Sequence, residues 1–309
     1  MQSSAIRTIR VAIAQAAPVY YDKAASLAKA VDLIREAASQ GAVLVAFGET
    51  WFSGYPAWLD VCPTAALWDH EPTKGVFAQL RENSVSLEGP EVCRLANAAR
   101  DLQIGVIIGV NERVEKGPAQ KTLYNSLLIF SPEGRLVNHH PKLVPTFTER
   151  LVWGPGDGAG LTSVEYGQVR VGGLICWEHW MPLARMAMHQ AGEHVHVAVW
   201  PTVNEMAQLA SRHYAFEGRC FVLAVGLMMP TQDIPSALPH EVNEVWVERG
   251  GSAIISPDAA YLVEPIYDRE QLIVADLDLS MIDRECMNLD VSGHYARPDV
   301  FTFSHRAIK

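Results

Sequence analysis

The chain has 309 residues and a mass of 34.0 kDa, with 49% hydrophobic residues, 19% charged residues and a formal net charge of −10. This composition is typical of a compact globular protein and not of a disordered one, and the negative charge opposes binding to nucleic acids or anionic membrane surfaces. The first residues do not resemble a secretory signal, and no apolar stretch reaches the roughly 18 residues that cross a bilayer. We therefore expect a cytoplasmic protein with no nucleic-acid or membrane partner.

Apolar runs rich in β-branched residues predict strands, and segments with helical periodicity lie between several of them. In chain order, the predicted strands are 8–15, 42–47, 104–114, 124–130, 169–176, 194–201, 220–227, 251–257, 261–267 and 272–279, and the predicted helices are 23–41, 90–102, 182–192 and 204–219. The alternation predicts an α/β protein, and the succession of strands between 221 and 277 indicates a mixed sheet or two packed sheets. The turns in "FSPEGRL" and "ISPDAAYL" predict two hairpins.

Five cysteines are spread along the chain with no CxxC pair, which predicts neither a disulfide framework nor a zinc site. Cys176 differs from the others because it ends the apolar strand of "VRVGGLIC", close to where a helix is predicted to begin. Amide groups and the helix dipole at such a turn favour the thiolate, so we expect a lowered pKa and a thiol exposed at the edge of the sheet. This position is compatible with a nucleophile and equally with a packing residue.

A thiol nucleophile usually requires a base, and none of the eleven histidines is an obvious one. His179 follows the candidate thiol by three residues and is expected to line the pocket, whereas His139 and His140 fall in a predicted loop. His194 and His196 face one side of a predicted strand, but no third ligand with the spacing of a metal site accompanies them. We therefore predict no metal site.

Two charged residues lie at a strand end and in a rigid loop instead of on helix surfaces. Glu49 follows the strand of "AVLVAF" and precedes several aromatic residues, so burial is expected to raise its pKa toward the range of a general base. The alternative for Glu49 is an acid hydrogen-bonded within a turn. Lys142 lies between two prolines in the mostly apolar segment "HHPKLVPTFTER", where a fixed ammonium would stabilise a developing negative charge. Neither residue alone identifies a site.

Together, these motifs occur in an order that resembles a known family. Glu49 in "FGETWFSGYP", Lys142 in "HPKLVPTFTERLVWGPGDG" and Cys176 in "GGLICWEHWMPLAR" are similar to the Glu-Lys-Cys set of the nitrilase superfamily of carbon–nitrogen hydrolases. The similarity extends from "RVAIAQAAP" to "SGHYARPDVF", and the stretch from Cys176 to Leu183 resembles the nitrilase branch. The resemblance implies a single carbon–nitrogen hydrolase domain over residues 1–309, built as a four-layer αββα sandwich of two mixed sheets.

The resemblance also implies catalytic roles. Glu49 would be the general base, Lys142 the ammonium that stabilises the tetrahedral species, and Cys176 the nucleophile. Glu149 in "TFTER" matches the family's second glutamate, which positions the lysine and the substrate; the alternative is a surface acid paired with Arg150. We expect alanine at position 142 or 176 to abolish turnover while the fold stays intact.

The implied reaction is hydrolysis of an organic nitrile to its carboxylic acid and ammonia through a covalent thioimidate and an acyl-thioester, without a cofactor. An aromatic or arylaliphatic nitrile is expected because aromatic residues lie beside the motifs. The predicted substrate-binding residues are Trp51, Tyr55, Trp177, His179 and Trp200. The alternatives are an amidase or a nitrile or cyanide hydratase with the same catalytic set, and an inactive binding protein of the same fold.

The resemblance further implies association of identical chains, commonly a dimer paired across a helical face and in some members a longer spiral. Nitrilases often continue well beyond the region of "GHYARPDVF", whereas this sequence stops at Lys309. We therefore expect a homodimer or a higher homo-oligomer, and we do not extend the expectation to long spirals that depend on such a tail.

Overall fold

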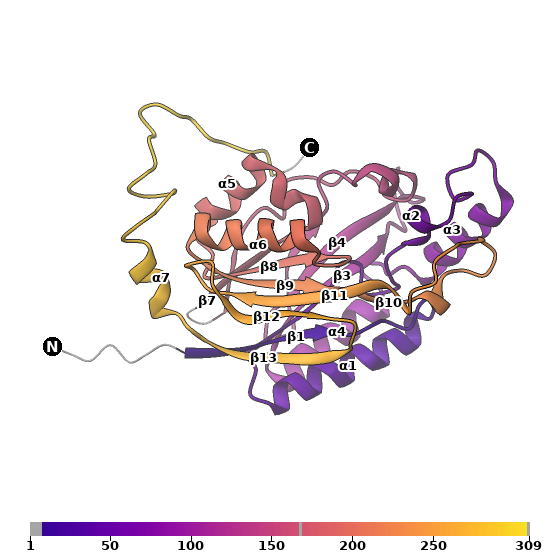
Figure 1. The fold of residues 1–309 in the computed structure, drawn as a ribbon, viewed down its shortest axis with the longest axis horizontal. Coiled ribbons are helices and arrows are strands. Elements are labelled where there is room, and N and C mark those ends of the chain that lie inside the picture. Colours follow the sequence, from indigo (N-terminus) through magenta and orange to yellow (C-terminus); the bar gives the residue numbers. More distant parts are fainter. Residues whose placement is uncertain (1–7, 167–168, 308–309) are drawn as a thin grey trace.

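Two mixed β-sheets pack face to face, and helices cover the outer face of each (Figure 1). The computed structural model describes residues 8–166 and 169–307. The first sheet has the order β13 (Gln271–Asp278), β1 (Thr8–Gln15), β2 (Leu44–Phe47), β3 (Gly105–Arg113), β4 (Leu123–Phe130) and β5 (Leu136–Pro141). The second has the order β10 (Met228–Pro230), β11 (Trp246–Ile255), β9 (Phe221–Gly226), β8 (Val195–Trp200), β7 (Val169–Ile175) and β6 (Val164–Tyr166), with β12 (Tyr261–Tyr267) also paired to β11.

The helices form the two outer layers of the sandwich. Those on the first sheet are α1 (Lys23–Ser39) and α4 (Pro90–Leu102), and those on the second are α5 (Pro182–Ala191) and α6 (Glu205–Gly218). The other helices are α2 (Trp58–Val61), α3 (Glu71–Asn83) and α7 (Ser280–Glu285), together with the 3-10 turns η1 (Phe147–Leu151), η2 (Cys176–Trp180) and η3 (Thr231–Asp233). The predicted four-layer αββα sandwich of two mixed sheets is therefore confirmed.

Strand β1 shows how the sequence builds these layers. Val11 and Ile13 belong to the core that lies between the sheets, whereas Ala12 and Ala14 pack with Ile34 of α1 on the opposite face. Successive side chains of a strand point to opposite faces, and both faces of β1 are buried, so its apolar run is continuous. The small alanines leave room for the helix.

All the predicted strands and helices are present, with ends that differ by a few residues. The two predicted hairpins are also confirmed, as β4–β5 and β11–β12. One prediction was wrong, because His139 and His140 lie on β5 and not in a loop. β5 is an edge strand that pairs only with β4, and an edge tolerates polar residues and a terminal Pro141. Helix α3 was not predicted because only Val76 and Leu80 are buried on it, too few for a clear helical period.

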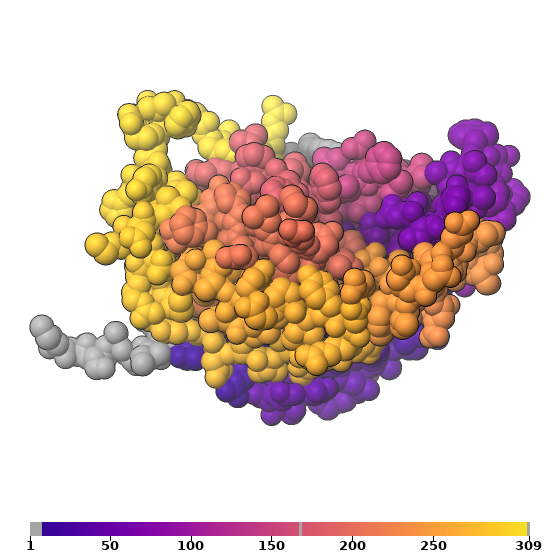
Figure 2. All heavy atoms as spheres, in the orientation of Figure 1, coloured from indigo at the N-terminus to yellow at the C-terminus, as the bar shows by residue number. Residues whose placement is uncertain are grey.

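The segment between β10 and β11 and the segment around α2 and α3 form the right-hand end of the molecule in Figures 1 and 2. Cys62, which follows α2, donates a hydrogen bond from Sγ to the Leu238 carbonyl at 3.7 Å, and Leu238 shares a buried cluster with Trp58. Within the described ranges, no helix is both long enough and apolar enough to span a bilayer.

The candidate functional residues follow the carboxyl ends of strands. Glu49 comes shortly after β2, Lys142 directly after β5 and Cys176 directly after β7, while Trp200 ends β8. Residues just beyond the carboxyl ends of parallel strands gather at one edge of a sheet. Since the two sheets face each other, side chains from distant parts of the sequence meet at one end of the sandwich.

Candidate active site

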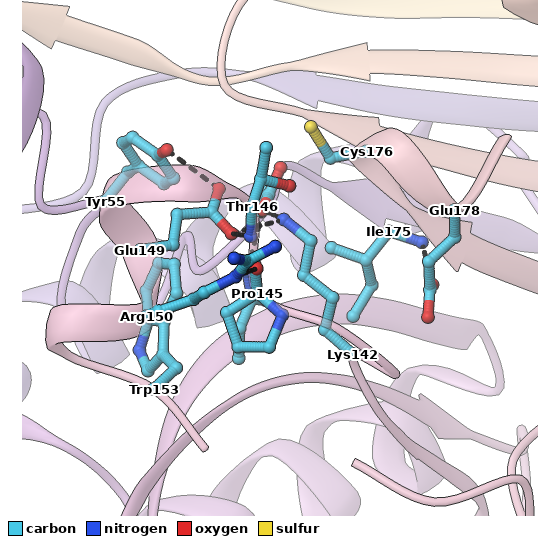
Figure 3. A network of polar contacts seen from close by, with 12 residues as sticks. Tyr55, Lys142, Pro145, Thr146, Glu149, Arg150, Trp153, Ile175, Cys176 and Glu178 are labelled. Carbon is cyan, nitrogen blue, oxygen red and sulfur yellow. Dashed lines mark hydrogen bonds and ion pairs between the residues drawn. The ribbon is translucent and has the colours of Figure 1, made fainter. Parts of the chain in front are cut away.

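Lys142 is held between Glu49 and Glu149 in the protein interior, and Figure 3 shows Lys142 with Glu149. Its Nζ donates hydrogen bonds to Glu49 Oε1 at 2.9 Å and to Glu149 Oε2 at 2.7 Å. The exposed fractions are 0% for Glu49, 1% for Lys142 and 2% for Glu149. Buried charges are costly unless they are paired, so the ammonium and the two carboxylates stabilise one another. The alternative of Glu149 as a surface acid paired with Arg150 is excluded, since Arg150 Nε donates to the Pro145 carbonyl instead.

Glu49 has the environment of a general base. Burial, assisted by repulsion from Glu149, raises the pKa of Glu49 to about 7, although Lys142 acts in the opposite direction. This is the direction expected from the sequence. Oε1 accepts hydrogen bonds from Lys142 and from Asn125 Nδ2, whereas Oε2 is buried and has no hydrogen-bond partner among the described residues. The lone pairs of Oε2 are therefore available to accept a proton.

The structure contradicts the expected exposure and pKa of Cys176. Its side chain is 5% exposed, and burial together with the Glu49 carboxylate raises the pKa of the thiol well above its ordinary value, against the opposing effects of Lys142 and the Trp177 N–H. No long helix compensates, because Cys176 opens the turn η2 and α5 begins only at Pro182. The thiol is therefore protonated at rest, and a base must remove its proton.

The backbone is strained at three points of the site. Thr50, Phe147 and Cys176 adopt left-handed conformations with φ of 43°, 41° and 51°. Such conformations cost about 1–3 kcal/mol each for residues other than glycine and cluster at functional sites. Thr50 follows the candidate base, Phe147 lies shortly before Glu149, and Cys176 is the candidate nucleophile itself. The strain therefore coincides with the residues that need an unusual orientation.

Glu178 joins the loop after β5 to the turn η2. This role is not predicted from the sequence. Its Oε1 accepts a hydrogen bond from Leu143 N at 2.8 Å, and its Oε2 accepts one from Ile175 N at 2.7 Å. Burial alone would raise the pKa of Glu178, but His140 and the two backbone N–H groups lower it. Glu178 thus holds the segments of the candidate ammonium and nucleophile in register. Its position two residues after Cys176 was the available signal.

Tyr55 and Asn125 orient the two glutamates. Tyr55 Oη donates a hydrogen bond to Glu149 Oε1 at 2.9 Å, and Asn125 Nδ2 donates one to Glu49 Oε1 at 2.7 Å. Thr146 N also donates to Glu149 Oε2, at 2.7 Å. From the sequence, Tyr55 is expected only as a substrate contact, and the pairing of Asn125 with Glu49 is not predicted.

A cavity of about 470 Å³ is lined by residues of this group and by aromatic side chains, including Tyr55, Glu149, Cys176, Trp177, Trp180 and Trp200. Three of the predicted substrate-binding residues, Tyr55, Trp177 and Trp200, therefore lie in its wall. Trp177 is 58% exposed, whereas Trp200 is buried. The candidate nucleophile thus opens onto a space that is large enough for a small organic molecule.

The other two predicted substrate-binding residues, Trp51 and His179, are not among the residues that line the cavity. Both are fully buried. Trp51 Nε1 donates a hydrogen bond to the Ala16 carbonyl at 2.6 Å, and its ring packs edge-on against Phe47. We therefore do not retain these two residues as substrate contacts. The sequence placed them near the motifs but did not reveal the direction of their side chains.

His179 belongs to a buried chain of hydrogen bonds behind the nucleophile. Its Nδ1 donates to the Cys176 carbonyl at 2.7 Å, and its Nε2 lies 2.9 Å from Nε2 of His196. His196 Nδ1 lies 2.9 Å from Glu193 Oε1. Burial, assisted by His196, lowers the pKa of His179 to about 3, so its ring is neutral at physiological pH. His179 therefore supports the strained backbone of Cys176 and is poorly suited to act as a base.

Sequence comparison identifies relatives over almost the whole chain. A family model described as "Carbon-nitrogen hydrolase" matches residues 10–284. "Nitrilase 2" from an unknown prokaryotic organism is 41% identical over 298 residues, which cover 96% of this chain and 91% of that protein. "Aliphatic nitrilase" from Sinorhizobium fredii (strain HH103) is 39% identical and covers 94% of each chain. "Bifunctional nitrilase/nitrile hydratase NIT4A" from Lupinus angustifolius is 38% identical, covering 96% and 85%.

Among solved structures, a "CN-hydrolase Superfamily Protein" from Xanthomonas campestris has the same fold. The TM-score is 0.70 at 20% sequence identity, and the match covers 96% of this chain and 98% of that one. At this identity the similarity establishes the architecture, and the chemistry rests on the residues described above.

Proposed function

Because the chain belongs to the carbon–nitrogen hydrolase family, in its nitrilase branch, we propose that it hydrolyses an organic nitrile to the carboxylic acid and ammonia through a covalent intermediate on Cys176. The family establishes an enzyme that acts on carbon–nitrogen bonds, and the nitrilase-named relatives support nitrilase activity. The observation that carries the proposal is one buried group, Glu49, Lys142 and Glu149, placed beside a thiol in a cavity wall.

In the first half-reaction, Glu49 Oε2 accepts the proton of the Cys176 thiol as Sγ forms a bond to the nitrile carbon. A nitrile carbon is a weak electrophile, so a soft sulfur nucleophile is required. The electron pair of the C≡N bond moves to nitrogen, which takes the proton from Glu49 to give a thioimidate. The Lys142 ammonium and the Trp177 N–H, which both act to lower the pKa of the Cys176 thiol, would stabilise the negative charge that develops.

In the second half-reaction, water adds to the thioimidate carbon and loses a proton to Glu49. Protonation of nitrogen then releases ammonia and leaves an acyl-thioester on Cys176. A second water molecule, deprotonated by the same carboxylate, releases the carboxylic acid and restores the thiol. Two water molecules are thus consumed for each nitrile. Lys142 stays positive throughout, because Glu49 and Glu149 outweigh burial and raise the pKa of its ammonium.

We further propose that the preferred nitriles are aromatic or arylaliphatic. Five aromatic side chains line the cavity, Tyr55, Phe147, Trp177, Trp180 and Trp200. Flat, rigid walls of this kind favour aromatic ligands through stacking and edge-to-face contacts. A relative named "Aliphatic nitrilase" means that the family alone does not decide between the two classes.

The purified enzyme is expected to release ammonia and acid in equal amounts from phenylacetonitrile, with a higher kcat/KM than for pentanenitrile. Chromatography of the products and a coupled ammonia assay measure both. Amide as the major product would instead support a hydratase, a second activity that one relative's name includes. Turnover of phenylacetamide with no turnover of any nitrile would overturn the proposal in favour of an amidase.

The value of kcat/KM for a neutral nitrile is expected to rise about tenfold per pH unit up to about pH 7 and then to level off. Glu49 must be ionised to accept the thiol proton, and its pKa is raised to about 7, so the active fraction grows with pH. A pH series from 5 to 9 measures this limb. The Glu248→Gln variant should keep the apparent pKa of this pH profile near 7. This control distinguishes Glu49 from Glu248, whose pKa burial raises to about 8. A rate independent of pH between 5 and 8 would contradict Glu49 as the base.

We also propose that the chain associates with identical copies. Large apolar side chains on α5 and α6 support this, because Leu183, Met206, Leu209 and Phe216 are each more than 40% exposed on the outer helical layer. Apolar side chains gathered on one surface are typical of an interface between subunits.

A further inference from the structure

The cavity that contains Cys176 is acidic beyond its catalytic group. Asp60, Glu149 and Glu248 line it, and no lysine, arginine or histidine is among its lining residues in the described part of the chain. Glu149 is neutralised by Lys142, as shown by the hydrogen bond of 2.7 Å. Asp60 and Glu248 remain, so the space around a bound substrate has a negative potential when these carboxylates are ionised.

Glu248 is the partly buried carboxylate of this pair, and no cationic side chain within the described residues is paired with it. It lies on β11, and its Oε2 accepts a hydrogen bond from Thr202 Oγ1 at 2.6 Å. The adjacent Arg249 donates instead to Asp268 Oδ1 at 2.7 Å. Burial, with repulsion from Asp60 and Glu49, raises the pKa of Glu248 to about 8, although Thr202 acts against this shift. A cationic group on a ligand would supply the positive charge that the described residues do not provide to Glu248.

Asp60 has a weaker influence than Glu248. Its side chain is exposed and accepts a hydrogen bond from Thr148 Oγ1 at 2.7 Å. Water and salt screen an exposed carboxylate, so its effect on a ligand charge is small. The charge preference of the cavity therefore depends mainly on Glu248.

One element acts in the opposite direction, because α6 begins beside the cavity and a helix N-terminus favours anions. The partial positive charge at the N-terminus of α6 is already compensated within the helix. Asn204 Oδ1 accepts a hydrogen bond from Ala207 N at 3.1 Å, and Glu205 places a carboxylate in the first turn. The helix therefore does not offset the charge of Glu248.

The cavity wall beside Glu248 also contains a donor that lacks a partner. Trp200, two residues before Thr202, is 3% exposed, and its Nε1 has no hydrogen-bond partner among the described residues. Buried donors are normally paired, so this N–H indicates contact with a hydrogen-bond acceptor of the ligand, which is a different part of it from the cationic group. The faces of Trp177, Trp180 and Trp200 also favour a cation over an anion.

We propose that Glu248 is a specificity-determining residue, which selects nitriles with an ammonium or similar cationic group remote from the nitrile carbon over neutral and anionic nitriles. The inference rests on the proposed nitrilase reaction and adds the charge of its substrate. Glu248 acts on binding and takes no part in the steps at Cys176.

Three nitriles with one skeleton test this selection: 4-(aminomethyl)phenylacetonitrile, 4-methylphenylacetonitrile and 4-(cyanomethyl)benzoate. The methylene group between ring and nitrile insulates the reacting carbon from the substituent. At about pH 8, near the raised pKa of Glu248, where about half of this carboxyl is ionised, kcat/KM should be highest for the cationic nitrile. Glu248→Gln should lower the ratio of cationic to neutral kcat/KM about five- to tenfold.

Two further variants sharpen the result. Glu248→Lys should raise the ratio of anionic to neutral kcat/KM above its wild-type value. Glu244→Gln, which changes an exposed carboxylate outside the cavity, should leave both ratios within about twofold of wild type. Circular dichroism confirms that each variant is folded. Ratios unchanged by Glu248→Gln, or a wild-type preference for the anionic nitrile, would overturn the inference.

Binding to Cys176→Ala, measured by calorimetry with the same three nitriles, separates this inference from the proposed reaction. If nitriles are turned over but the ratios of kcat/KM between them do not depend on Glu248, the inference is overturned and the proposed reaction stands. Binding that favours the cation and requires Glu248, without turnover of any nitrile by the wild type, would overturn the reaction and support the selection. Absence of both binding and turnover would contradict both.

Discussion

Replacement of Cys176 with alanine is expected to lower kcat for nitrile hydrolysis by about 10⁵-fold or more, the scale of loss when a covalent nucleophile is removed. The fold should be retained, because alanine keeps the Cβ atom and the small change in volume lies at a cavity wall. The left-handed φ of 51° exists already in the parent and adds no new strain. A sensitive ammonia assay gives the residual rate, and circular dichroism gives the melting temperature.

The matched control is Cys220→Ala. Cys220 is also buried but lies outside the cavity, so its loss should affect stability at least as much as the loss of Cys176 and activity far less. The reactivity of Cys176 can also be measured by labelling with iodoacetamide. Peptide mapping is then needed to identify the labelled residue, because Cys93 is exposed and will react whether or not the site is functional. More than about 1% activity in Cys176→Ala, or an equal loss in the two variants, would contradict covalent catalysis at Cys176.

The sequence predicted the position of the site along the fold because the relevant signals are local. An apolar run that stops at Cys176, or just before Glu49, identifies the end of a buried strand. These signals mark Glu49 and Cys176 one at a time, and their grouping with Lys142 into one site came from the order of the three motifs, which resembles the nitrilase superfamily. The raised pKa of Glu49 was also predictable from the local signal, since it depends mainly on burial.

The sequence could not predict the contacts that set the chemistry of the thiol. The pKa of the thiol is raised first by burial and then by the Glu49 carboxylate, which belongs to the other sheet. Likewise, Trp51 and Tyr55 are four residues apart, yet only Tyr55 is among the residues that line the cavity. Left-handed φ angles occur at Thr50, directly before Trp51, and at Ser53, between the two residues. Irregular turns of this kind have no periodicity from which side-chain direction could be read.

Replacement of Lys142 with methionine is expected to remove activity and also to destabilise the protein, in contrast to the intact fold expected from sequence. Methionine keeps most of the volume of the stem but leaves Glu49 and Glu149, both buried, without their shared cation. Breaking a buried ion pair on one side costs about 3–5 kcal/mol. For a chain of this size, the melting temperature should fall by roughly 5–15 °C in a thermal scan. Lys74→Met, which removes an exposed lysine paired on the surface, should change it little.

The destabilisation of Lys142→Met should increase with pH. The ammonium lowers the pKa of Glu49, which burial and Glu149 raise from 4.5 to about 7, so its removal raises that pKa further. Between about pH 4.5 and 7, the folded form binds more protons than the unfolded chain in both proteins, because the pKa of Glu49 is raised in both. Above about pH 7 this continues only in the variant, so its free energy of unfolding falls further below that of the wild type. The difference from wild type should be smallest at pH 5 and largest at pH 8. Equal losses at both values would contradict this account, because a packing defect does not titrate.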